Sequence, residues 1–320
     1  MPVGRFAPSP SGPLHLGNLR TAMVAWLCAR HSESRFLLRI EDLDPLTSRP
    51  EHEAGQLADL IALGLDWDAP VVRQSERRAA HEAALAELER QGLTYPCFCS
   101  RREVREASVA PHLPPGTYPG TCRRLTADEV ATRMGSGRPA AVRLRAAGEA
   151  VTIADRRHGS VTRPASDIVL RRNDGVPAYH LAVVVDDAYQ GVEEVVRGDD
   201  LLDATPSQAH LLDRLGLPRP VWAHVPLVLG PDRHRLAKRH GAVTLADLAG
   251  QGIDAARVRT ALAESLGLAS ADERVAMGEV LSRFDPDALP TTAWVLRASP
   301  SGVQPTTTTS VDVRPNTSGE

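Results

Sequence analysis

The chain has 320 residues, of which 24% are charged and 42% hydrophobic, and its formal net charge is −3. This composition excludes a collagen-like repeat, an intrinsically disordered chain and a small disulfide scaffold. There is no run of about 18 apolar residues and no apolar signal core at the N-terminus, so we expect a cytoplasmic protein that does not bind membranes. We also expect a monomer.

The first part of the chain alternates between strands and helices. In chain order, the predicted elements are a strand at 3–7, a helix from about His15, a strand at 36–40, a helix at 51–63, a strand at 71–74 and a helix at 76–91. This rhythm is typical of an α/β fold in which helices cover a mostly parallel, Rossmann-type sheet. We expect residues 1–94 to form the first half of this sheet domain.

Between residues 95 and 165 the alternation stops, which indicates an insertion. The segment contains a loop rich in Pro and Gly, two short predicted strands and three of the four cysteines. In a cytoplasmic chain, cysteines indicate a metal site or free thiols rather than disulfides. Cys97, Cys99 and Cys122 suit a tetrahedral zinc site that needs a fourth ligand, and general coordination chemistry prefers His112 for it.

The alternation resumes over residues 166–243, the expected second half of the sheet domain. The predicted elements there are strands at 168–171, 192–196 and 222–229, an apolar run at 181–185 and a helix at 206–215. Residues 244–298 are predicted to form short helices, two within 245–266 and a third near 279–284. Residues 299–320 contain four consecutive threonines and no aromatic residue, so we expect a disordered tail.

Two further features indicate a phosphate-binding site. A loop stiffened by prolines ends at His15-Leu-Gly-Asn18, where the first helix begins. The amide groups of a helix N-terminus suit a phosphate, and Gly17 would let a nucleotide approach the backbone closely, although an ordinary capped helix has the same pattern. Lys238 is the only lysine among 37 basic residues, so a compact ammonium group stands where the chain otherwise uses arginine.

These motifs together resemble the glutamyl branch of the class I aminoacyl-tRNA synthetases. The segment Arg5-Phe-Ala-Pro-Ser-Pro-Ser-Gly, then His15-Leu-Gly-Asn18, then Arg39-Ile-Glu-Asp-Leu-Asp resembles the HIGH region and its surroundings. The segment 233–239 resembles the KMSKS loop, with Leu236 in place of the methionine, Ala237 in place of the first serine and Lys238 at the second lysine. The sequence after this loop is short, which narrows the resemblance to the truncated glutamyl-Q tRNA(Asp) synthetases.

The resemblance implies a fold and a set of site residues. The expected fold is a class I synthetase Rossmann-type parallel sheet with a zinc-binding insertion and a small, stem-contact-like C-terminal helical region. His15 and Lys238 are the implied catalytic residues, and together with Gly17 and Asn18 they would bind ATP, which enters with Mg²⁺. The implied glutamate-binding residues are Arg5, Phe6, Ala7, Pro8, Ser9, Glu41, Tyr179 and Arg197. The implied ligands of one zinc ion per chain are Cys97, Cys99, Tyr118 and Cys122.

The implied activity has two steps. ATP would activate L-glutamate as glutamyl-adenylate, and the glutamyl group would pass to the queuosine base in the anticodon of tRNA(Asp). Three alternatives stay open at this point: a truncated glutamyl-tRNA synthetase that charges a tRNA 3′ end, a ligase that passes glutamate to another acceptor, and a catalytically inactive module that binds zinc and RNA. The set of Arg5, Glu41, Arg197 and Lys238 argues against the inactive module.

Overall fold

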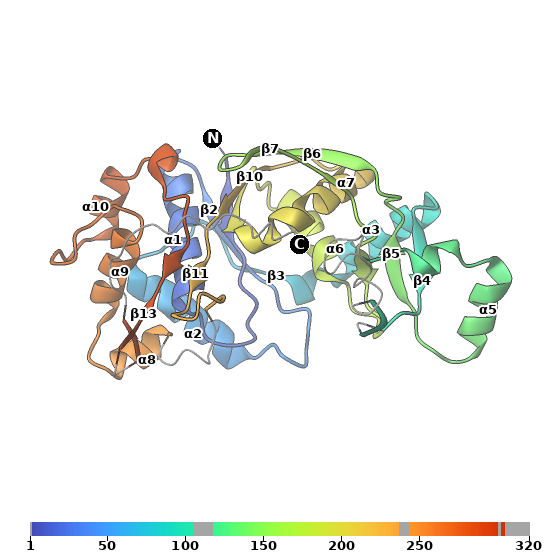
Figure 1. Ribbon diagram of the computed structural model, residues 1–320, viewed down its shortest axis with the longest axis horizontal. Helices are drawn as coiled ribbons and strands as arrows, with labels where there is room; N and C mark the ends of the chain where they lie inside the picture. The colour runs from blue at the N-terminus through green and yellow to red at the C-terminus, as the bar shows by residue number, and fades with distance from the viewer. Residues whose placement is uncertain (1, 101, 105–117, 237–242, 300–301, 305–320) are drawn as a thin grey trace, which may run out of the picture. The chain divides into compact units, whose positions relative to one another are not determined.

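The computed structural model describes residues 2–100, 102–104, 118–236, 243–299 and 302–304. The chain forms two compact units. Unit 1 comprises Met1–Val72, Glu193–Leu201 and Trp222–Glu320, and unit 2 comprises Arg73–Val192 and Leu202–Val221. Each unit is therefore built from segments that are far apart in the sequence (Figure 1).

A mostly parallel sheet forms the centre of unit 1. Its strands are β1 (Gly4–Phe6), β2 (Phe36–Ile40), β9 (Glu194–Gly198) and β10 (Val221–Val225), in the order β2-β1-β9-β10. β1 pairs in parallel with both β2 and β9. β1 therefore lies between β2 and β9. The chain adds β2 on one side of β1 and later adds β9 on the other side. Such a reversal of strand order is where ligands bind in open α/β sheets.

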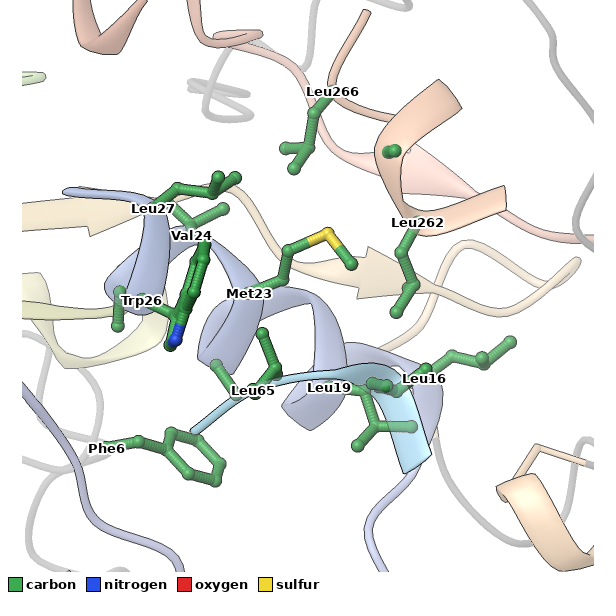
Figure 2. Packing of buried hydrophobic residues seen from close by; sticks show 14 of the residues in the cluster. Phe6, Leu16, Leu19, Met23, Val24, Trp26, Leu27, Leu65, Leu262 and Leu266 are labelled. Atoms are coloured by element: carbon green, nitrogen blue, oxygen red, sulfur yellow. The ribbon is translucent and has the colours of Figure 1, made fainter. Parts of the chain in front are cut away.

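Helix α1 (Leu16–His31) is the core helix of unit 1 and confirms the helix predicted to begin near His15. Leu16, Leu19, Met23 and Leu27 repeat at spacings of three and four residues and are completely buried. The other faces of α1 are also buried. They contact the strands β1 and β9 and the helices α9 (Ala255–Glu264) and α10 (Met277–Ser282) (Figure 1). Figure 2 shows Met23 reaching from α1 toward Leu262 of α9.

The remaining elements of unit 1 surround this core. They are α2 (Pro50–Leu63), β11 (Val228–Leu229), α8 (Leu245–Ala249), the short 3-10 helix η5 (Pro286–Ala288), β12 (Trp294–Val295), β13 (Arg297–Ser299) and β14 (Gly302–Gln304). Two short elements, β3 (Val72–Arg73) and the 3-10 helix η3 (Asp199–Ala204), contain residues of both units. The predicted helices at 51–63 and within 245–266 are confirmed.

Two predictions for this part of the chain need correction. The strand predicted at 222–229 is divided into β10 and β11, with Pro226 between them. Proline has no N–H group to donate within a sheet, so a strand tends to break there. The disordered tail predicted from residue 299 is wrong for residues 299 and 302–304, because they belong to the antiparallel hairpin of β13 and β14. Residues 305–320 lie outside the described residues.

Unit 2 contains two antiparallel groups of strands with helices around them. The first group is β4 (Thr94–Cys97), β5 (Ala141–Leu144) and β8 (Val169–Arg171), and the second is the hairpin of β6 (Ala150–Asp155) and β7 (Gly159–Pro164). The helices are the short 3-10 turns η1 (Gln74–Arg77) and η2 (Thr121–Arg124), with α3 (Arg78–Arg90), α5 (Ala127–Gly135), α6 (Tyr179–Tyr189) and α7 (Thr205–Leu215). The apolar run at 181–185 is thus a helix.

A buried polar cluster explains why unit 2 is larger than the predicted insertion at 95–165. The carboxylate of Asp186 in α6 is completely buried. It accepts hydrogen bonds from Gln74 Nε2 at 3.0 Å and Arg77 Nε at 2.6 Å, and it lies 3.0 Å from His81 Nε2. A buried carboxylate is stable only when several donors surround it. This cluster joins η1 and α3 to α6, so residues outside 95–165 belong to the same unit.

Within the described part of the chain, no helix has the length and apolar character needed to cross a bilayer.

Candidate active site

Three predicted site residues of unit 1 lie at or near the carboxyl ends of adjacent strands. Arg5 belongs to β1, Arg197 belongs to β9, and Glu41 follows β2 directly. The Arg5 and Arg197 side chains are both buried, and Arg5 Nη1 donates to the carbonyl oxygen of Val196 at 3.3 Å. Two buried guanidinium groups on neighbouring strands concentrate positive charge at the point where the strand order reverses. This arrangement favours a carboxylate ligand.

The Glu41 carboxylate is oriented by a buried arginine. Arg39 has no exposed surface, and its Nη2 lies 3.2 Å from Glu41 Oε1. This ion pair fixes the position of one oxygen of the Glu41 carboxylate. Glu41 follows the strand next to β1, so acidic and basic side chains meet at this end of the sheet, as an amino acid with an ammonium group and carboxylates requires.

The loop that follows β1 is fixed by a residue that the sequence analysis missed. Gln56 of α2 donates through Nε2 to the carbonyl oxygens of Ser9 at 3.0 Å and Gly12 at 2.7 Å. On the other side, the amide of Glu41 donates to the carbonyl of Pro8 at 2.9 Å. One sequence signal was available: Gln56 interrupts the buried stripe that Leu60 and Leu63 continue on the same helix face.

His15 is the N-cap residue of α1, and its capping hydrogen bonds determine which ring nitrogen carries the proton. Its Nδ1 accepts a hydrogen bond from the Asn18 amide at 3.2 Å, while Asn18 Oδ1 accepts from the His15 amide at 3.2 Å. The proton of the neutral ring is therefore on Nε2, which becomes a donor. Burial, and then the nearby Arg235, lower the pKa of His15 to about 4, so the ring is neutral at pH 7.

The position of the His15 ring leaves no room for a side chain at residue 17, so a glycine is needed there. A Cβ atom at this position would lie 2.9 Å from Cε1 of His15, which is closer than a side-chain atom tolerates. The glycine thus lets the His15 ring fold back over the start of α1, beside the amide groups of the helix N-terminus. A neutral N–H donor and a helix N-terminus together suit a phosphate group.

The segment 233–239, which resembles the KMSKS loop, is described only at residues 233–236, and the described residues resume at Val243. Arg235 Nη1 pairs with Asp200 Oδ2 at 2.6 Å, and the Leu236 amide donates to the carbonyl of Val228 at 3.1 Å. At the other end, the carbonyl of Val243 accepts from the Leu16 amide at 2.9 Å, next to His15. Ala237 and Lys238 lie outside the described residues, so the catalytic role of Lys238 stays a prediction.

The structure brings the predicted metal ligands of unit 2 together. The Sγ atoms of Cys97, Cys99 and Cys122 all lie within 4.8 Å of one another, with 3.5 Å between the last two. The hydroxyl of Tyr118 is 3.4 Å from Cys97 Sγ and 3.9 Å from Cys99 Sγ. A tetrahedral site with Zn–S bonds of about 2.3 Å has S···S edges of about 3.8 Å, so these four groups fit one zinc ion.

The chemistry of the cluster agrees with its geometry. Without a cation, burial, the hydrogen bond that Cys99 donates to Cys122 and the negative charge of the neighbouring thiolates raise the pKa of Cys99 to about 12. Burial and the hydrogen bond with Cys97 likewise raise the pKa of Tyr118. Several thiolates therefore require a metal ion to exist side by side. His112, the alternative fourth ligand, lies outside the described residues.

Tyr179 is the predicted glutamate-binding residue of unit 2. It is the first residue of α6, it is 36% exposed, and its ring lies 5.3 Å from that of His180 in an edge-to-face arrangement. The exposed position is compatible with contact to a ligand, and its role toward glutamate stays a prediction.

Comparison with known proteins extends over nearly the whole chain. A glutamyl-Q tRNA(Asp) synthetase from Nocardia farcinica is 58% identical over 92% of this chain and 93% of its own length. A protein of the same name from Symbiobacterium thermophilum is 47% identical over 91% of this chain and 94% of its own length. The crystal structure of a glutamate tRNA ligase from Elizabethkingia meningosepticum, in complex with its amino acid, matches with a TM-score of 0.77 and 27% identity. That match covers 92% of this chain and 66% of the solved chain.

The family comparison is as extensive. Residues 3–297 match the family described as tRNA synthetases class I (E and Q), catalytic domain. This range contains all the predicted site residues as well as the cysteine cluster, and synthetases of this class use ATP. The chain therefore belongs to the class I tRNA synthetases of the E and Q group and is a ligase of the aminoacyl-tRNA synthetase type.

Proposed function

We propose that this protein activates L-glutamate with ATP and transfers the glutamyl group to the queuosine base in the anticodon of tRNA(Asp). The observation that carries the first step is the placement of Arg5, Glu41 and Arg197 at one edge of the sheet. The acceptor is supported by the two relatives named glutamyl-Q tRNA(Asp) synthetase, which align over more than nine-tenths of both chains.

The charges of the site suggest how glutamate binds. Arg5 and Arg197 would hold a carboxylate of the substrate, and Glu41, oriented by Arg39, would accept hydrogen bonds from its ammonium group. The loop that Gln56 holds would supply the other contacts. The residues that we assign to the glutamate site in addition are Phe6, Ala7, Pro8, Ser9 and Tyr179.

ATP would bind at the start of α1. His15 would donate through Nε2 to a phosphate oxygen, Gly17 and Asn18 would contribute the helix N-terminus, and Lys238 would neutralise the charge that develops on the phosphates. Mg²⁺ would enter as part of the ATP substrate and would help to neutralise the charge of its phosphates. The protein needs no covalent nucleophile, because positioning and charge stabilisation suffice for phosphoryl chemistry of this kind.

Two displacements complete the reaction. An oxygen of the glutamate α-carboxylate attacks the α-phosphorus of ATP, the bond to the bridging oxygen breaks, and pyrophosphate leaves. A hydroxyl group of the queuosine cyclopentenediol then attacks the carbonyl carbon of glutamyl-adenylate. AMP leaves with the oxygen of the broken bond, and the hydroxyl proton passes to solvent.

Cys97, Cys99, Tyr118 and Cys122 would hold one zinc ion with a structural role. The ion would stabilise the fold of unit 2 and would take no part in either displacement. We also propose that the chain acts as a monomer, which sedimentation of the purified protein tests.

The test has two stages. We expect glutamate-dependent exchange between ATP and labelled pyrophosphate in the absence of tRNA. Incubation with labelled glutamate, ATP and tRNA(Asp) should then label queuosine-containing tRNA and leave queuosine-free tRNA unlabelled. Exchange without any labelling of tRNA would indicate a different acceptor. Absence of exchange would support the inactive binding module and refute the proposal.

A further inference from the structure

A buried histidine contacts the arginine that we assign to the substrate carboxylate. His224 lies on β10 with no exposed surface, and Arg197 lies on the adjacent strand β9 and is 6% exposed. Arg197 Nε donates a hydrogen bond to His224 Nε2 at 3.1 Å. Both residues belong to unit 1, so the contact lies within one compact unit.

This hydrogen bond determines where the proton of His224 is. A guanidinium nitrogen has only N–H groups to offer, so His224 Nε2 must present its lone pair. The proton of the ring is therefore on Nδ1, and the ring is neutral. A protonated ring would place a second cation against Arg197 inside the protein, where like charges repel strongly. His224 thus acts as an uncharged acceptor that leaves the positive charge of Arg197 intact.

The contact also determines which way the guanidinium group faces. The group is planar and rigid, and a carboxylate binds best to a pair of parallel N–H groups on one of its edges. Holding Nε against His224 fixes the plane of the group and the direction of the Nη1 and Nη2 atoms. If the Nη1 and Nη2 atoms shift by a few tenths of an ångström, or the group rotates by about ten degrees, the paired contact with a carboxylate weakens.

We propose that His224 is a positioning residue that orients Arg197 toward the carboxylate of the amino acid substrate. The inference rests on the proposed function, because it takes Arg197 to be a glutamate-binding residue. It assigns His224 no contact with substrate. Its effect should therefore appear in the affinity for glutamate and be absent from the affinity for ATP.

The chain contains a matched control for this contact. His210 in α7 of unit 2 is 2% exposed, and its Nε2 accepts a hydrogen bond from Arg214 Nε at 3.4 Å. Burial, and then Arg214, lower the pKa of His210, so this ring is also a neutral acceptor. Arg214 pairs with Glu149 at 2.5 Å and has no role in the proposed reaction. Removal of His210 thus reproduces the chemical change without touching the site.

The experiment measures pyrophosphate exchange for the whole protein and its variants. His224→Phe keeps a ring of similar size without the acceptor, and we expect it to raise KM for glutamate about tenfold or more while KM for ATP stays within about twofold. His224→Gln can place its Oε1 near the position of Nε2, so it should bring KM for glutamate back to within about threefold. His210→Phe should leave both KM values unchanged.

A double-mutant cycle separates this role from general damage to the fold. In an Arg197→Ala background, His224→Phe should change KM for glutamate by less than about twofold, because the group that it positions is gone. The proposal would be overturned if the increases in KM for glutamate caused by the two single substitutions multiplied in the double variant. So would an unchanged KM for glutamate in His224→Phe, or a Gln variant as impaired as the Phe variant. If the wild-type protein itself shows no glutamate-dependent exchange between ATP and pyrophosphate, the proposed function is refuted instead.

Discussion

The two units of this protein differ in net charge and in how many buried arginines they contain. Unit 1 has 17 basic and 24 acidic residues, a net charge of −7, whereas unit 2 has 20 basic and 16 acidic residues, a net charge of +4. Yet four of the five buried arginines in the described part of the chain belong to the acidic unit: Arg5, Arg20, Arg39 and Arg197, with Arg143 the fifth. The net charge of a region therefore does not reveal where its cations are used.

The difference corresponds to two kinds of anion. Buried, oriented guanidinium groups in unit 1 suit a small ligand with a defined shape, such as an amino acid. In unit 2 most arginines lie at the surface, among them Arg124, Arg133, Arg138, Arg145 and Arg156. Surface cations attract a polyanion such as RNA over a broad area and do so with a dependence on salt. From this comparison we expect unit 1 to activate glutamate and unit 2 to make part of the contact with RNA.

The largest effect is expected at the only lysine. Lys238→Ala should lower glutamate-dependent pyrophosphate exchange by 100-fold or more, on the order of 3 kcal/mol of barrier, because it removes a positive charge from the transition state. Lys238→Arg should also be impaired, since a planar fork does not replace a compact ammonium group. Arg274→Ala, an exposed cation of the same unit, is the control. Exchange within about threefold of wild type in the alanine variant would refute the role of Lys238.

The next largest effect is on KM for glutamate, and it should differ between two buried arginines of unit 1. Arg197→Lys should raise KM for glutamate about 30-fold, because lysine cannot form the paired contact with a carboxylate. Arg20 is as deeply buried, but its hydrogen-bond partners are Ser265 and the carbonyl of Pro226, neither of which is assigned to the glutamate site. Arg20→Lys should lower Tm and leave KM unchanged. Equal KM values in the two variants would contradict the assignment of the glutamate site.

Glutamine offers a second test of this assignment. Its side-chain amide would leave a buried guanidinium group without a counter-charge, so glutamine should support exchange at least 100-fold less efficiently than glutamate.

A smaller effect on the reaction is expected from the metal cluster. We expect one equivalent of zinc per chain by elemental analysis of protein purified without chelator. Cys122→Ser should lose the metal, lower Tm and reduce transfer to tRNA about tenfold, with less effect on exchange, because the cluster belongs to unit 2. Cys28→Ser, a buried thiol of α1 outside the cluster, should retain zinc. A protein that is fully active without metal would make the zinc site dispensable.

The smallest effect concerns the surface of unit 2. Arg133→Glu should raise KM for tRNA about threefold and leave exchange unchanged, since one exposed cation contributes modestly to binding a polyanion. Arg257→Glu makes the same change at an exposed position of unit 1. If this control weakens tRNA binding as much as the unit 2 variant does, the division of roles between the units is wrong.

The sequence predicted well where a local pattern suffices. The spacing of Leu16, Leu19, Met23 and Leu27 predicted α1, since all four are buried on one helix. In contrast, α5 was missed although Thr126 and Glu129 form its capping box, because none of its residues is fully buried and no apolar stripe marks it. The parallel sheet was expected from the alternation of strands and helices, which is a property of the whole segment.

The features that sequence analysis missed depend on contacts between distant residues. Gln56 reaches the loop at Ser9 and Gly12, more than 40 positions away, and His224 contacts Arg197 across two strands. Asp186 gathers its partners from a segment more than 100 positions earlier. Each of these residues resembles an ordinary polar residue in the sequence. Only the pairing of strands and helices reveals what it holds in place.

One measurement tests the central claim most directly, namely that glutamate is attached to the anticodon of tRNA(Asp). Queuosine-containing tRNA(Asp) is trimmed enzymatically of its 3′-terminal adenosine and incubated with the protein, ATP and labelled glutamate. We predict that the trimmed tRNA is labelled as fully as intact tRNA, because the accepting hydroxyl group lies on queuosine. Loss of labelling after trimming would contradict the claim and place the glutamyl group at the 3′ end.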